Sequence, residues 1–143
     1  DIADEFLNSG VILYEATDSL EIYDEYTAES GGLATDIPLA VLVNGGSASG
    51  SEVLAGALQD HGRATIIGTQ TFGKGSVNQP TELSDGSALY LTTARWLTPD
   101  QHAIEGVGIT PDFVVEKSDE DAASDIDTQL NFAIEYLNSQ IQP

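Results

Sequence analysis

The chain has 143 residues, of which 41% are hydrophobic and 20% charged, a composition that suits one globular domain with an apolar core. Its 24 acidic and 4 basic residues give a net charge of −20, which argues against nucleic acids and anionic membranes as partners because both require a basic protein surface. No apolar run approaches the ~20 residues of a membrane-spanning helix, and the absence of cysteine excludes disulfides, thiolate nucleophiles and zinc sites with cysteine ligands.

The N-terminal third of the chain predicts the end of a helix followed by three strands. Ala3, Phe6 and Leu7 lie at helical spacing, and Gly10 is a suitable C-cap for that helix. Three segments rich in β-branched, aromatic or other apolar residues predict strands, namely 11–16, 20–26 and 37–44. The third segment is apolar along almost its whole length, which is typical of a fully buried strand.

The middle of the chain predicts a strand, a helix and a second strand. Residues 50–62 favour a helix that ends at Gly62. Its apolar residues pair at i,i+4 spacing, namely Val53 with Ala57 and Leu54 with Leu58. Residues 64–69 then predict another buried strand. Strand, helix and strand in this order form a right-handed crossover, so we expect an α/β domain built in layers.

The segment after the second buried strand predicts a hairpin and one further strand. Asp85 and Gly86 are typical of a hairpin turn, and Pro80 places the first strand of that hairpin at a sheet edge. Residues 108–116 predict the last strand of the domain.

The C-terminal region predicts an acidic linker and a final helix. We expect the linker at 117–125 and the helix at 126–142. The apolar face of that helix consists of Ile126, Leu130, Ala133, Leu137 and Ile141. Residues 1–116 are therefore the expected core of a single domain that spans residues 1–143.

The turn after the third strand contains the first candidate for chemistry. In "GGSASGSE", Ser47 and Ser49 follow the carboxyl end of a predicted buried strand and precede a predicted helix, which is where α/β proteins place active sites. Two interpretations of Ser49 are open. Ser49 and Glu52 satisfy the pattern S-x-x-E, so the Ser49 hydroxyl would cap the helix. Alternatively, Ser49 is a nucleophile, provided that a base takes the proton of its hydroxyl.

The segment "GTQTFGKGS" supplies a candidate base, Lys74, one of two lysines in the chain. Gly68, Gly73 and Lys74 also fit the start of a phosphate-binding loop. However, Gly75 occupies the position of the required Ser or Thr, and the following residues predict strands where such a loop needs a helix. Nucleotide binding is therefore disfavoured. A lysine acts as a base when burial lowers its pKa, and a glycine-flanked loop after a buried strand could bury it.

Histidine is the alternative base for a serine nucleophile, and the chain contains His61 and His102. His61 lies at the end of a predicted helix, where the helix dipole favours it, and His102 lies in a polar turn. The pattern G-x-S-x-G, which marks the nucleophile of α/β-hydrolases, is absent around both Ser47 and Ser49. The sequence therefore favours a lysine over a histidine as the partner of the serine.

Three long segments, "VLVNGGSASGSEVLAGALQDHGRATIIGTQTFGKGSV", "LSDGSALYLTTARWLTPD" and "IEGVGITPD", closely resemble the C-terminal processing, or tail-specific, serine peptidases. The resemblance implies a crotonase-like or ClpP-like layered α/β core and a Ser-Lys dyad. In that dyad Ser49 is the nucleophile and Lys74, 25 positions later, is the general base. Asp60 falls on a position where the family usually has an aspartate that supports the structure of the site.

The same resemblance implies the substrate and the setting of the reaction. Family members cut the C-terminal tails of other proteins outside the cytoplasm, and no metal or organic cofactor is implied. Gly50 follows the nucleophile where the family often has alanine, and its N–H is the implied oxyanion donor. Asn78 stands where many members have a glutamine that hydrogen-bonds the lysine.

The resemblance also predicts what lies outside these 143 residues. The chain contains no methionine and begins at Asp1, so we expect a processed product or a piece of a longer protein. The family's second oxyanion donor lies in an upstream segment, and a PDZ domain usually binds the substrate tail; neither is in this sequence. We therefore expect the chain alone to be inactive. A non-catalytic, peptidase-like interaction module remains the alternative function.

Overall fold

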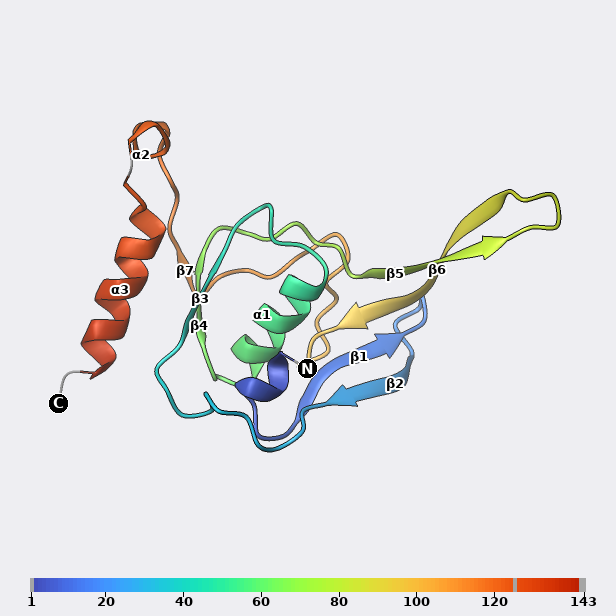
Figure 1. Ribbon diagram of the computed structural model, residues 1–143, viewed down its shortest axis with the longest axis horizontal. Helices are drawn as coiled ribbons and strands as arrows, with labels where there is room; N and C mark the ends of the chain where they lie inside the picture. The colour runs from blue at the N-terminus through green and yellow to red at the C-terminus, as the bar shows by residue number, and fades with distance from the viewer. Residues whose placement is uncertain (1, 125, 142–143) are drawn as a thin grey trace.

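The structure is a computed structural model that describes residues 2–124 and 126–141. It contains two β-sheets, three α-helices and one short 3₁₀ helix in the described residues (Figure 1). The elements in chain order are η1 (Ala3–Glu5), β1 (Val11–Ala16), β2 (Ile22–Thr27), β3 (Ala40–Val43), α1 (Gly50–Asp60), β4 (Thr65–Gly68), β5 (Ser76–Glu82), β6 (Ala88–Leu97), β7 (Phe113–Val114), α2 (Asp119–Ala123) and α3 (Thr128–Ile141). This alternation of strands and helices confirms the predicted α/β class.

The smaller sheet is parallel and has the strand order β3-β4-β7. Strand β3 pairs with β4 from Ala40 opposite Thr65 to Val43 opposite Gly68, and α1 is the crossover between the two strands. The predicted strand–helix–strand unit is therefore confirmed. Strand β3 is not fully buried as the sequence suggested, since Leu42 keeps 40% of its surface exposed.

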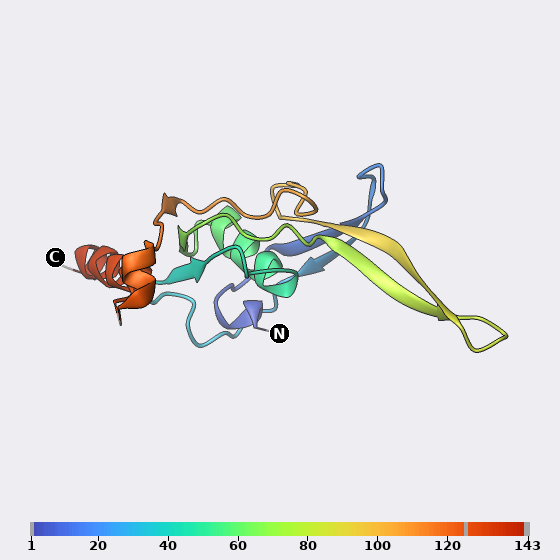
Figure 2. The same ribbon diagram turned by 90° about the horizontal axis from the view of Figure 1, so that it is seen from above.

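The larger sheet is antiparallel and has the strand order β2-β1-β6-β5. Strand β5 lies at an edge, as Pro80 predicted. Beyond the main body, β5 and β6 continue as a long two-stranded hairpin that projects from the molecule in both views (Figures 1 and 2). Every residue from 78 to 93 is exposed, so this hairpin has no packing layer within the described chain.

The layers are arranged around helix α1. This helix lies between the two sheets and packs on β1 and β4, while α3 packs on β3 and β4 from the other side of the parallel sheet (Figures 1 and 2). The core residues around α1 are Ala3, Leu7, Ile12, Val43, Ala55, Ala57, Leu58, Ala64 and Ile66. Because α1 is buried on two sides, its N-terminus is held in a fixed position relative to both sheets.

The first helix and the last strand are both shorter than the sequence predicted. The first helix is one 3₁₀ turn that ends at Glu5, so Gly10 is not its C-cap; Ala3 and Leu7 are buried, and one turn suffices to bury them. The strand predicted at 108–116 is limited to β7. The N–H of Ile109 donates to the side chain of Thr71 instead of to a neighbouring strand, which prevents an earlier start.

The C-terminal region contains more helix and less apolar packing than the sequence predicted. The acidic linker at 117–125 includes helix α2, whose N-cap is Ser118, and α3 starts two residues later than expected. Residues 125 and 142, at which the predicted linker and helix end, lie outside the described residues. The predicted apolar face of α3 is only partly covered: Ala133 is buried, whereas Ile126, Leu130 and Ile141 are exposed. Phe132 and Tyr136 pack on Phe113 instead.

Candidate active site

Ser49 lies at the start of α1 and has an unusual backbone conformation. Its φ of 59° and ψ of −122° fall in a region that residues with a side chain rarely adopt. Such a conformation costs about 1–3 kcal/mol and is concentrated at functional sites. The strained turn projects from the carboxyl end of β3, where the sequence placed the candidate serines.

Ser47 stabilises the turn that precedes Ser49. The N–H of Ser47 donates to the carbonyl of Asn44 at 2.8 Å, and its hydroxyl accepts a hydrogen bond of 3.2 Å from the N–H of Asn44. The Asn44 side chain accepts from the N–H of Gly46 at 2.8 Å. Ser47 is thus part of the turn, which leaves Ser49 as the candidate nucleophile.

Ser49 and Glu52 form a capping box at the start of α1. On the glutamate side of this box, the carboxylate Oε2 of Glu52 accepts from the N–H of Ser49 at 2.8 Å. The capping interpretation of S-x-x-E is therefore confirmed, and it does not exclude a second role for the serine. The Ser49 side chain is partly buried at this helix terminus.

Glu52 joins the serine turn to the segment that carries Lys74. Its fully buried carboxylate accepts hydrogen bonds from the Thr71 hydroxyl at 2.5 Å, the Gly73 N–H at 2.6 Å and the Lys74 N–H at 2.8 Å. Burial opposes ionisation of this carboxyl group, but its hydrogen bonds outweigh burial and hold the pKa of Glu52 below the ordinary value. One carboxylate thus fixes the backbone of both candidate catalytic residues.

Residues 71–75, which we call the lysine loop, are also tied to the segment 104–109. The Thr71 hydroxyl accepts from the N–H of Ile109 at 2.7 Å, and the Gly73 carbonyl accepts from the N–H of Gly106 at 2.9 Å. Gly73 has a φ of +87°, and a Cβ there would lie 3.1 Å from the backbone nitrogens of residues 107 and 108. Only glycine combines this conformation with so close a contact.

The Lys74 side chain is exposed, in contrast to the burial that the sequence argument required. In residues 2–124 and 126–141, its amine has no hydrogen-bond or ion-pair partner. The reason for the difference is that Gly73 and Gly75 bury the loop backbone against residues 104–108 while the lysine side chain stays outside this contact. The structure fixes the backbone of Lys74 beside the serine turn and leaves the amine in solvent.

Gly50 lies directly after Ser49 at the first position of α1. In the part of the chain that the structure describes, its N–H has no backbone or side-chain acceptor. Gly50 also borders a cavity of about 360 Å³. The cavity is lined mostly by apolar side chains, namely Ile2, Ala3, Ile12, Leu13, Tyr26, Val53, Leu54 and Trp96. An available N–H therefore lies beside an apolar space.

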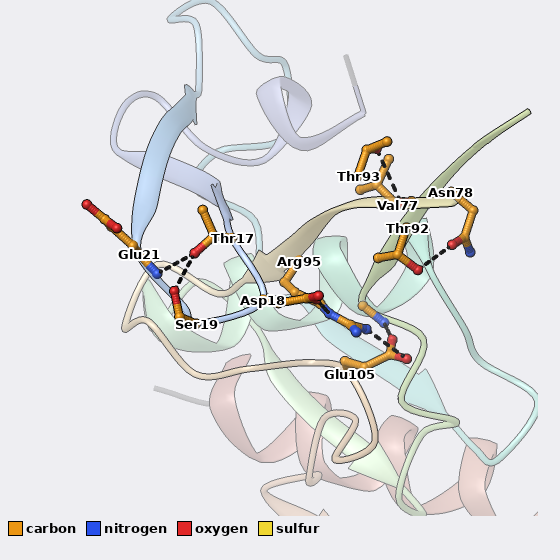
Figure 3. A network of polar contacts seen from close by, with 11 residues as sticks. Thr17, Asp18, Ser19, Glu21, Val77, Asn78, Thr92, Thr93, Arg95 and Glu105 are labelled. Carbon is orange, nitrogen blue, oxygen red and sulfur yellow. Dashed lines mark hydrogen bonds and ion pairs between the residues drawn. The ribbon is translucent and has the colours of Figure 1, made fainter. Parts of the chain in front are cut away.

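The remaining predicted site residues lie elsewhere. The Asn78 side chain accepts from the Thr92 hydroxyl at 2.8 Å across the β5–β6 hairpin (Figure 3). Asp60 accepts from the N–H of Asp100 at 2.9 Å. It ends α1, about 16 Å along the helix from the serine turn. Within the described residues, the Asn78 side chain forms no hydrogen bond with the lysine amine and the Asp60 side chain none with Ser49.

The two histidines are not brought to the serine. The His61 ring lies 2.7 Å from the carbonyl oxygen of Val11 and against Gly10, so it fastens the end of α1 to the start of β1. The His102 side chain has no hydrogen-bond partner among the described residues. Both positions agree with the sequence argument against a histidine base.

Two further properties concern the described residues. They contain no group of three or more His, Cys, Asp or Glu side chains arranged to hold a metal ion. None of the helices that they form is both long enough and apolar enough to span a membrane.

Comparisons with known proteins identify the family of the chain. Residues 1–115 match the model of peptidase family S41. The carboxy-terminal-processing protease of Bartonella bacilliformis is 52% identical over 116 residues, which are 81% of this chain and 27% of that protein. The carboxyl-terminal-processing protease of Synechocystis sp. is 44% identical over 99% of this chain and 33% of that protein. The chain thus spans between about a quarter and a third of the length of these relatives.

Solved structures give the same result at the level of the fold. The photosystem II D1 C-terminal processing protease superposes with a TM-score of 0.78 and 38% identity over 95% of this chain and 33% of that chain. The tricorn protease, at 19% identity, has a TM-score of 0.66 over 97% of this chain and 13% of its own, a likeness in fold alone. These neighbours agree with the expected crotonase-like or ClpP-like layered core. The chain belongs to peptidase family S41, the family of the C-terminal processing serine proteases.

Proposed function

We propose that Ser49 and Lys74 form the Ser-Lys dyad of an endopeptidase that cleaves the C-terminal tails of proteins. The observation that carries the proposal is the strained Ser49 turn at the start of α1, whose backbone shares one carboxylate with Lys74. A strained serine at a helix N-terminus is the geometry of a preorganised nucleophile.

The chemistry follows from these positions. The neutral Lys74 amine takes the proton of the Ser49 hydroxyl while the serine oxygen attacks the carbonyl carbon of the scissile peptide bond. The Gly50 N–H donates to the oxyanion that forms. When the C–N bond breaks, the lysine ammonium returns the proton to the leaving amine. Water, activated by the same lysine, then hydrolyses the acyl-enzyme and regenerates the serine.

The cavity beside Gly50 gives this site a preference for substrates. Its volume of about 360 Å³ and its aliphatic and aromatic lining favour an apolar side chain close to the scissile bond. A tail with apolar residues near the cleavage position fits this site better than a charged tail. The family resemblance implies a reaction outside the cytoplasm, and we propose that setting for this protein; two further relatives, from Arabidopsis thaliana, are described as chloroplastic.

Cleavage of a labelled tail peptide by the complete protein tests the proposal. Ser49→Ala and Lys74→Ala should each abolish cleavage, and Lys74→Arg should do so as well, because a guanidinium cannot give up its proton at the pH of the assay. His102→Ala, which leaves the dyad intact, is the matched control. Full activity of Lys74→Arg would remove the lysine from the mechanism.

A non-catalytic interaction module is the second candidate, and the exposed Lys74 amine is the observation that favours it. In that case the fold would bind tails without cutting them. The two candidates differ in one measurement: a module would bind the labelled peptide with equal affinity before and after Ser49→Ala, and no product would form with either protein.

A further inference from the structure

The lysine loop is held by a second carboxylate, that of Glu105. Its Oε2 accepts a hydrogen bond of 2.8 Å from the N–H of Gly75, the residue after Lys74. Gly75 is buried, and a Cβ there would lie 2.5 Å from the backbone nitrogen of Glu105, so the two backbone segments are in direct contact. A buried N–H without an acceptor is strongly unfavourable, and the position of Gly75 therefore depends on Glu105.

Glu105 is in turn held by Arg95 of strand β6. Nη1 of Arg95 lies 3.2 Å from Oε1 of Glu105, and its Nε donates to Oδ1 of Asp18 at 2.9 Å (Figure 3). Arg95 stands opposite Ser76 in the β5–β6 ladder, directly beyond the lysine loop. A single exposed ion pair contributes little. A planar guanidinium that engages two carboxylates through different nitrogens, however, fixes both of them.

All four oxygens of the carboxylates that hold the lysine loop are occupied. Glu52 uses both oxygens for donors of the serine turn and the lysine loop. Glu105 uses one for Gly75 and one for Arg95. In the described residues, neither carboxylate forms an ion pair with the Lys74 amine. Such an ion pair would stabilise the ammonium form, which cannot accept a proton from a serine.

We propose that Glu105 and Arg95 are positioning residues for Lys74. Glu105 fixes the lysine loop at Gly75, and Arg95 fixes Glu105. The pair acts through the loop backbone, so it need not touch the substrate. This inference rests on the proposed role of Lys74 as the base, but the contact itself can be tested separately.

Amide hydrogen exchange of this chain tests the contact without any activity. In Glu105→Ala the Gly75 N–H loses its acceptor and should exchange at least about tenfold faster. Glu105→Gln, whose amide oxygen still accepts, should keep most of the protection. The N–H groups of Gly73 and Lys74, which are bound to Glu52, are internal references for the folded state. Unchanged exchange at Gly75 in Glu105→Ala would overturn the proposal.

Kinetics of tail-peptide cleavage by the complete protein test the effect on the lysine. Glu105→Ala should lower kcat about 10- to 100-fold with little change in KM, because a small displacement of a catalytic group has an effect of this size. Glu105→Gln removes the charge but keeps an oxygen that accepts from the Gly75 N–H, so it should retain most of the rate. If the charge alone mattered, Glu105→Gln would be as slow as Glu105→Ala. Arg95→Gln should lower kcat by a smaller factor, and should add nothing in the Glu105→Ala background because both changes act through one contact.

The control for these kinetics is Glu82→Ala, which removes an exposed carboxylate from the projecting hairpin. A kcat for Glu105→Ala equal to that of Glu82→Ala would overturn the positioning role. Cleavage that survives Ser49→Ala and Lys74→Ala would instead refute the proposed function, and the exchange of Gly75 would still decide whether Glu105 holds the loop.

Discussion

Glu52 has two tasks, of which the sequence indicated only one. The pattern S-x-x-E indicated a helix cap, and the carboxylate does cap α1 by accepting from the Ser49 N–H. The same carboxylate also receives three donors from the lysine loop. This second task could not be predicted, because local sequence does not reveal that residues 71–74 pack on the start of α1. The motifs singled out Ser49 and Lys74 as candidates, and their catalytic roles stay predictions.

We expect Glu52→Gln to lower the free energy of unfolding by about 3 kcal/mol, because an amide has one acceptor oxygen and its NH₂ group would face backbone donors. Since the folded-state pKa of Glu52 is depressed, the ionised carboxylate contributes its full stability above the ordinary value of 4.5, and this contribution is lost as the pH falls through the lower folded-state pKa.

Urea unfolding of both proteins at several pH values provides the measurement. The difference in free energy of unfolding between the unsubstituted protein and Glu52→Gln, which we call the stability gap, should be constant near neutral pH and shrink in acid. Glu82→Gln, at an exposed position, serves as the control and should show no gap. A gap for Glu52→Gln that does not narrow below the ordinary carboxyl pKa would contradict the assignment of the stabilising hydrogen bonds to the ionised form.

The order and type of most elements were predictable because their signals are local. The apolar run before Asn44, the i,i+4 pairs of α1 and the Asp85-Gly86 turn each specify one element. The first helix and the last strand were predicted less well. In the last strand, the Ile109 N–H donates to the hydroxyl of the distant Thr71 and not to a neighbouring strand, which the local strand pattern could not show. The close approach of the lysine loop to residues 104–106 is also non-local and has no signal in the sequence.

Substitutions at two glycines of the site would test how closely the lysine loop packs on residues 104–105. A Cβ at Gly75 would lie 2.5 Å from the backbone nitrogen of Glu105 and 2.9 Å from the Cβ of Ile104, whereas a Cβ at Gly50 has no atom within 4 Å. Gly75→Ala should therefore destabilise the chain by about 1–3 kcal/mol. Gly50→Ala should be neutral or stabilising by at most about 1 kcal/mol, because alanine is the better helix former.

Thermal unfolding of these two variants would distinguish the positions. Equal melting temperatures of Gly75→Ala and Gly50→Ala would show that the backbone segments at Gly75 are farther apart than the structure has them. A large loss in Gly50→Ala would mean that the first turn of α1 is packed against atoms outside the described residues.

At the scale of the whole molecule, the layered α/β architecture followed from the predicted strand–helix–strand unit, but the arrangement of the second sheet did not. The order β2-β1-β6-β5 joins segments that are more than 70 residues apart, as in the pairing of Glu15 with Trp96. The projecting hairpin is another property of the whole fold, since hairpin signals do not tell how far a ribbon extends beyond its sheet.

We expect this chain alone not to cleave tail peptides, even when it is folded. The Gly50 N–H is the single oxyanion donor that we assign within it, and the loss of one such donor typically lowers kcat about 10²- to 10³-fold. Incubation of equal concentrations of the chain and of the complete protein with a labelled peptide that ends in a small apolar residue measures the difference. Comparable rates would mean that residues 1–143 contain the whole oxyanion site.

The carboxylate of Glu52 couples the serine turn, the start of α1 and the lysine loop, so substitutions in these three segments affect one another. Its four donors come from Ser49, Thr71, Gly73 and Lys74, so a change at one position alters the cost of a change at the others. Effects measured one position at a time will therefore not sum. Anyone who transplants this serine and lysine to another scaffold must carry over the glutamate and both backbone segments together, because no smaller part of the site retains its geometry.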